Sequence, residues 1–161
     1  MTPERDRDER GRPRFAGPRD RLGRPLPRGR RDQLAGRGDP ARDDPTPAVA
    51  LAEAARLFDA ERYFEAHEYF EYLWKHPAVD DGHRSTWRAA AQLAVGLCHG
   101  QRGNRRGASR VLRRASHALD RIDQAPPGVD RHALAALARA ACERVDRGEP
   151  SDGRLPRFPR R

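Results

Sequence analysis

The chain has 161 residues, of which 36% are hydrophobic and 35% charged, and its formal net charge at pH 7 is +9. This length suits one ordinary domain. There is no run of 18 apolar residues and no apolar N-terminal stretch, which excludes a membrane-spanning helix and a secretory signal. Cys98 and Cys142 lie in apolar stretches without metal-type spacing, so we expect them to be reduced and buried. These features predict a cytoplasmic protein.

Apolar residues are concentrated between positions 46 and 147. Residues 1–45 hold half of the 14 prolines and few large apolar side chains, and residues 148–161 have a similar composition. Segments of this kind cannot bury enough apolar surface to offset the entropy lost when they are ordered. We therefore predict a helical domain over 46–147, between a disordered basic tail at 1–45 and a second at 148–161.

The first predicted helix starts at Thr46-Pro47, where a hydroxyl N-cap precedes proline at the first helical position. The second covers about 63–76 and ends before Pro77, which cannot continue a helix. The third covers about 83–102, and its centre is small or apolar on every side. A helix that is apolar all round is a buried one, so we expect the third helix to lie at the centre of the fold.

The fourth predicted helix, about 104–121, has two distinct faces, with apolar residues on one arc and arginines on the opposite arc. The fifth runs from Asp130, a plausible N-cap, to Gly148. Short loops join all of these helices, which is typical of a bundle. The predicted fold is all-α: a compact bundle of about five helices with disordered N- and C-terminal tails.

The second and third predicted helices carry polar side chains next to aromatic or otherwise apolar residues. His67 and Glu71 lie one turn apart on the second helix, and Arg88, Gln92 and His99 share one arc of the third. Because buried polar groups need partners, we expect the two stripes to face each other. This predicts a ligand pocket or a buried polar network that consists of His67, Glu68, Glu71, Trp74, Arg88, Gln92 and His99.

Three interpretations of this cluster stay open. In the first, it only sets the helix register, with Glu71 paired to Arg88. In the second, it binds a small ligand or an anion beside Trp74. In the third, it holds a divalent metal through His67, Glu71 and His99, with Glu68 as a candidate base. The zinc-protease pattern H-E-x-x-H is incomplete, because Glu71 stands at the second histidine position, so we exclude a protease.

The arginines of the fourth helix, Arg106, Arg110, Arg113 and Arg114, form a possible anion-binding face. A solvated surface is the ordinary explanation for such a face. The alternative is sequence-independent contact with nucleic-acid phosphates, helped by the basic tails. The pair Gly103 and Gly107 lacks the lysine of a phosphate loop, and we expect it to allow close helix contact instead.

Two segments together resemble a bacterial family signature. The first is YFEAHE at 63–68, continuing through Glu71 to Trp74, and the second is QLA at 92–94 with His99 and RGNRRGA at 102–108. They resemble the domain-of-unknown-function 309 family over about residues 50–122. The resemblance implies a small helical bundle and no established activity. It implies shared positions at His67, Glu68, Glu71, Trp74, Gln92, His99, Gly103, Asn104, Gly107 and Ala108. A glycine is expected in the turn near Arg62, where this chain has Glu61-Arg62.

We therefore predict a binding or interaction module with a polar pocket between the second and third helices. Whether it catalyses a reaction stays open. One alternative is a metal-dependent enzyme that uses His67, Glu71 and His99. Another is an accessory electrostatic binder of nucleic acid. The lean, alanine-rich core also allows a homodimer, because small domains bury a limited fraction of their surface.

Overall fold

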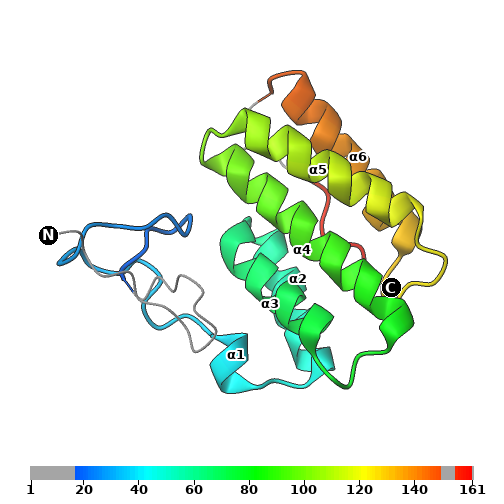
Figure 1. Cartoon of the computed structure of the whole chain (residues 1–161), viewed down its shortest axis with the longest axis horizontal. Helices are drawn as coiled ribbons and strands as arrows, with labels where there is room; N and C mark the ends of the chain where they lie inside the picture. The colour runs from blue at the N-terminus through cyan, green and yellow to red at the C-terminus, as the bar shows by residue number, and fades with distance from the viewer. Residues whose placement is uncertain (1–16, 150–154, 161) are drawn as a thin grey trace, which may run out of the picture. The chain divides into compact units, whose positions relative to one another are not determined.

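The computed structural model describes residues 17–149 and 155–160. Residues 1–16, 150–154 and 161 belong to the two predicted tails and lie outside the described residues. The chain divides into two compact units, Met1–Arg37 and Gly38–Arg161. Six helices are described, all of them in the second unit (Figure 1).

In the first unit, residues 17–37 form hydrogen-bonded turns. The Asp20 carboxylate accepts bonds from the backbone N–H groups of Leu22 and Arg24 at 2.9 and 2.8 Å. Asp32 accepts a bond from the backbone N–H of Arg19 at 3.0 Å. Short acidic side chains that bond to nearby backbone favour turns over helices.

The second unit contains one short helix and five longer ones. Their bounds are α1 (Pro40–Asp43), α2 (Pro47–Asp59), α3 (Tyr63–Lys75), α4 (Asp81–Gln101), α5 (Arg105–Asp120) and α6 (Arg131–Asp146). The five longer helices are those predicted, and the all-α bundle is confirmed. Thr46, Asn104 and Asp130 cap α2, α5 and α6 through their side chains, as N-caps of these types do.

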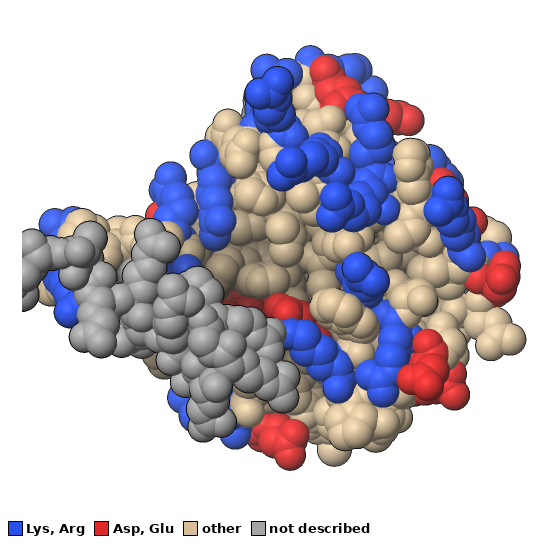
Figure 2. Space-filling model, in the orientation of Figure 1, with Lys and Arg blue, Asp and Glu red and all other residues tan. Residues whose placement is uncertain are grey.

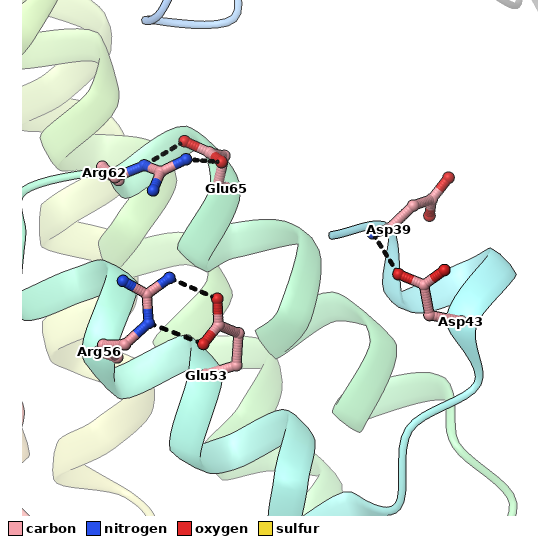
Figure 3. Close-up of polar contacts among 6 residues, drawn as sticks. All are labelled: Asp39, Asp43, Glu53, Arg56, Arg62 and Glu65. Carbon is pink, nitrogen blue, oxygen red and sulfur yellow. Dashed lines mark hydrogen bonds and ion pairs between the residues drawn. The ribbon is translucent and has the colours of Figure 1, made fainter. Parts of the chain in front are cut away.

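Helix α1 lies inside the segment that was predicted to be disordered. Asp39 accepts a hydrogen bond from the N–H of Ala41 at 3.1 Å, and Asp43 accepts one from the N–H of Asp39 at 2.9 Å (Figure 3). This reciprocal pair satisfies donors that a helix start leaves open. The hydroxyl of Tyr72 on α3 then donates to Asp44 at 2.8 Å, which ties the end of α1 to the bundle.

Helix α4 is the central element, as predicted from its apolar sequence. It packs against α3 on one side and α5 on the other, while α2 packs on α3 and α6 on α5 (Figure 1). Gly96 brings α4 and α5 together: a β-carbon at this position would lie 2.6 Å from Cγ of Leu112. The close helix contact expected at Gly103 and Gly107 is therefore made by Gly96 instead.

The two glycines after α4 have other roles. Gly103 has a φ of +75°, a left-handed conformation that glycine adopts without strain. The N–H of Gly107 donates to the capping side chain of Asn104 at 2.9 Å, and a side chain on Gly107 would collide with that cap. Both residues thus shape the start of α5.

The C-terminal segment 155–160 was also predicted to be disordered, yet it packs on the bundle. Phe158 is 3% exposed, and its ring centroid lies 5.6 Å from that of Phe58 and 5.0 Å from that of Phe70. Its N–H donates to Asp59 at 2.7 Å. Aromatic side chains bury a large apolar area, so this ring links the segment 155–160 to the bundle.

The turn between α2 and α3 contains Glu61, near the position where the family resemblance leads us to expect a glycine. Glu61 has a φ of +59°, which costs a residue with a β-carbon about 1–2 kcal/mol. Its carbonyl accepts a bond from the Gln101 side chain at 2.8 Å. The backbone thus adopts at Glu61 the conformation for which glycine is preferred.

Candidate functional site

The polar residues of α3 have partners close to them in sequence. Nδ1 of His67 bonds with the carbonyl of Phe64, one turn earlier. Glu71 forms an ion pair with Lys75 of the same helix, and not with Arg88 as the purely structural interpretation predicts. Glu68 is half-buried. Both residues belong to α3, so the Glu71–Lys75 pair does not join α3 to α4. An i, i+4 pair between exposed side chains also contributes little to stability.

The polar arc of α4 points to two different neighbours. The guanidinium of Arg88 lies over the indole of Trp74, 5.3 Å from the ring centroid, as expected if α3 and α4 face each other there. At the other end of the helix, Nδ1 of His99 lies 3.1 Å from Nδ2 of Asn104, which caps α5. Burial, together with the nearby Arg102 and Arg110, lowers the pKa of His99.

The predicted three-ligand metal site is not formed. Among the residues that the structure describes, no three His, Cys, Asp or Glu side chains lie where they could hold a metal ion together. His67, Glu71 and His99 are all described, so this finding corrects the metal prediction made from them. The i, i+4 spacing of His67 and Glu71 places both on one side of α3, but spacing on one helix cannot bring in a third ligand from another.

Glu65 is a buried charge that sequence reasoning missed. Its side chain is almost fully enclosed, and the residue is 3% exposed. Arg62 binds it with two nitrogens, Nε at 2.7 Å from one carboxylate oxygen and Nη2 bonded to the other (Figure 3). A buried carboxylate needs such a partner. The signal in the sequence is a carboxylate in the first turn of a helix, three residues after an arginine.

The arginine arc of α5 is exposed, as predicted. Arg106, Arg110, Arg113 and Arg114 all lie at the surface, opposite the buried residues Leu112 and Leu119. Figure 2 shows Lys and Arg side chains gathered over the upper part of the bundle, where Figure 1 draws α5. An open hollow of about 790 Å³ follows this arc, and its lining consists of Arg106, Ser109, Arg110, Arg113, Arg114, His117, Ala118 and Arg121.

These arginines differ in whether a carboxylate already neutralises them. Nη2 of Arg113 donates to Asp146 at 2.9 Å. The Ser109 hydroxyl also donates to Asp146, at 2.6 Å, and this bond is the main reason that the pKa of Asp146 lies below its usual value. Within the described part of the chain, no carboxylate forms an ion pair with Arg106, Arg110 or Arg114. On the exposed arc that lines the hollow, these three residues of α5 therefore carry charge that no carboxylate neutralises.

A second hollow is lined by residues of α4 and α5 and of the segment that follows α5. Its volume is about 640 Å³, and it is lined by Gly82, Ser85, Arg88, Ala89, Gln92, Arg114, Ala118, Arg121, Ile122, Asp123 and Gln124. We call it the α4–α5 cleft. Arg88 and Gln92 were predicted to line a pocket between the second and third helices, whereas here they share a cleft with α5. Arg114, Ala118 and Arg121 line both hollows, so the two are neighbours.

The fold and this surface define a small all-helical bundle domain with an arginine-lined face. Residues 51–111 match the family model described as Domain of unknown function (DUF309), so the predicted resemblance is confirmed over this segment, from α2 into α5. The match includes Arg106 and Arg110 and ends before Arg113. Neither the curated proteins nor the solved structures contain a match to the chain. Among the described helices, none combines the length and apolar character needed to cross a bilayer.

Proposed function

We propose that this domain binds nucleic acid through contacts between the phosphate backbone and the arginine row of α5, which we define as Arg106, Arg110 and Arg114. The observation that carries the proposal is that these three exposed guanidinium groups have no carboxylate partner among the described residues. Arg113 is set apart from the row because Asp146 already binds it.

The spacing of the row suits a polymer of charges. Its members lie four residues apart on one helix, which corresponds to steps of about 6 Å along the helix axis. Guanidinium groups bind phosphate oxygens in a bidentate manner and stay charged at every physiological pH. A regular line of such groups offers one positive charge to each of several successive phosphates, and it reads no base sequence.

An anionic membrane is the other polyanion that attracts arginines. Helices that lie in a membrane interface insert an apolar face between the lipids. The apolar face of α5 instead belongs to the core, where Ala108, Leu112 and Leu119 are at most 2% exposed. The exposed arc has no large apolar side chain among its hollow-lining residues, so the composition of this surface favours nucleic acid.

Fluorescence anisotropy of a labelled DNA duplex, titrated with the full chain at salt concentrations from about 50 to 200 mM, tests the proposal. Each phosphate contact contributes about 0.9 to the slope of log affinity against log salt. We expect the triple variant Arg106→Gln, Arg110→Gln, Arg114→Gln to lower that slope by about 2 to 3. Circular dichroism verifies that the variant keeps its helices.

A matched control removes the same net charge from elsewhere. Arg42, Arg56 and Arg147 are exposed but bound to Asp43, Glu53 and Glu149. The control variant replaces all three with glutamine and is expected to keep the slope of the natural chain. Equal slopes for the row variant and the control would refute the proposal, as would binding to phosphatidylserine vesicles without binding to the duplex.

A further inference from the structure

We infer that the α4–α5 cleft binds a phosphomonoester, the doubly charged phosphate group at the end of a nucleic-acid strand or on a free nucleotide. This inference rests in part on the proposed function, because the row leads into the cleft through Arg114. It adds a chemical preference that the row alone does not provide, namely for strands that carry a terminal phosphate.

Several arginines surround one space in the α4–α5 cleft. Three arginines line the cleft: Arg88 from α4, Arg114 from α5, and Arg121, which follows the last residue of α5. None of them forms an ion pair with a carboxylate among the described residues. A phosphodiester within a strand carries one negative charge, whereas a phosphomonoester carries about 1.5 to 2 at neutral pH. Several arginines from two helices therefore suit the monoester better than the diester.

One cleft arginine is held in position before any ligand arrives. Arg88 lies over the indole of Trp74 at 5.3 Å, a cation–π arrangement that limits the rotation of its side chain. Less side-chain entropy is then lost when a ligand binds. Trp74 is thus a positioning residue for Arg88, which gives the predicted site residue Trp74 a specific role.

The other residues of the cleft determine which chemical groups can bind next to the phosphate. Gln92, Ser85 and Gln124 line it with hydrogen-bonding groups, and Ala89 and Ile122 line it with apolar ones. Its volume of about 640 Å³ lies in the range of small-ligand pockets, about 300–1,000 Å³. Asp123 also lines the cleft and opposes an anion. Three arginines against one aspartate still leave the cleft positive.

The experiment compares three duplexes of identical sequence by anisotropy: one with 5′-phosphate ends, one with 3′-phosphate ends and one with hydroxyl ends only. We expect the full chain to bind at least one phosphorylated duplex about tenfold more tightly than the hydroxyl duplex, the effect of one charge-assisted hydrogen bond. Arg88→Gln and Arg121→Gln should each abolish this preference, so that the phosphorylated and hydroxyl duplexes bind these variants equally. Arg139→Gln, in an ion pair with Asp120 on the other side of α5, should keep it.

Two further variants separate binding from a change in fold. Asp123→Asn removes the opposing charge and should increase the preference for the phosphorylated end, an effect that damage to the fold does not produce. Trp74→Leu should reduce the preference and spare the hydroxyl duplex. Competition by adenosine monophosphate at concentrations where adenosine has no effect would indicate that a free nucleotide also fits.

The outcomes distinguish this inference from the proposed function. Equal affinity for all three duplexes, with the salt slope still dependent on the row, overturns the phosphomonoester site and leaves the proposed function intact. No binding to any duplex, together with Arg88-dependent binding of adenosine monophosphate, overturns the proposed function and supports the cleft. Loss of preference in Arg139→Gln as strong as in Arg88→Gln overturns the inference.

Discussion

Replacement of Gly96 by alanine tests how closely α4 and α5 pack. An added β-carbon would lie 2.6 Å from Cγ and 3.2 Å from the backbone nitrogen of Leu112, whereas carbon atoms in ordinary contact lie about 3.5–4.0 Å apart. Leu112 is fully buried, so it has no free space to move into. We therefore expect α5 to shift away from α4, which would also alter the cleft between them.

Two opposing effects determine the magnitude. Alanine is favoured over glycine in a helix interior by about 1 kcal/mol, while overpacking a core costs about 1–3 kcal/mol. Because a backbone atom of α5 is among the contacts, we place the cost of overpacking near the upper end. The expected net loss in the free energy of unfolding is about 1–2 kcal/mol, or about 5–10 °C in Tm for a domain of this size.

Urea denaturation followed by circular dichroism measures this loss. The same substitution is also made in a Leu112→Ala chain, where the colliding side chain is gone. There only the contact with the backbone nitrogen at 3.2 Å opposes the helix preference of about 1 kcal/mol, so Gly96→Ala should destabilise the Leu112→Ala chain less than it destabilises the natural chain, or stabilise it. If Gly96→Ala stabilises the natural chain as well, the two helices are not in the close contact that the argument requires.

Four individual contacts can each be tested by substitution of one residue. Glu61→Gly should raise the free energy of unfolding by about 0.5–1 kcal/mol, since relief of the left-handed strain exceeds the entropy that glycine adds to the unfolded chain; Glu61→Ala should bring no gain, and an equal gain would contradict the strain. Thr86 is fully buried with no hydrogen-bond partner for its hydroxyl, so Thr86→Val should stabilise by about 1 kcal/mol in a urea titration, and destabilisation would reveal a bond to that hydroxyl. Phe158→Ala should cost up to about 3 kcal/mol, a loss that removal of residues 155–161 should reproduce and that would be absent if the segment did not pack. Because the pKa of His99 is lowered in the folded chain, the unfolded chain binds more protons, and stability should fall as the pH drops through about 6.5; His99→Gln should flatten that part of a pH series of urea midpoints, and an unchanged series would assign the effect to another group.

Many features of the fold depend only on residues that are close together in the chain, and the sequence alone predicts these features. Caps such as Thr46 and Asn104 mark where helices begin because the hydrogen bonds that they make reach only two or three residues along the chain. The arginine row faces solvent because the opposite arc of α5 is apolar and is buried. The apolar centre of α4 likewise identifies it as the central helix.

The sequence alone does not predict which side of a helix faces which neighbouring helix. The centre of α4 is apolar all round, so its periodicity does not say which arc faces α3 and which faces α5. For this reason Arg88 and Gln92 were assigned to a pocket with α3, while the structure places them in the cleft with α5. The metal site predicted from His67, Glu71 and His99 is wrong for a related reason. The spacing of residues along one helix fixes only the relative positions of ligands on that helix, and it does not show whether a ligand from another helix lies nearby.

Whether an apolar residue that is isolated in sequence becomes buried depends on the tertiary structure. Phe158 is a single aromatic in a polar, proline-rich segment, and nothing near it in the chain indicates burial. Its ring is buried beside Phe58 and Phe70, which come from two helices far away in sequence. Burial depends on the apolar surface that distant segments present to one another, and this surface exists only after the helices have packed.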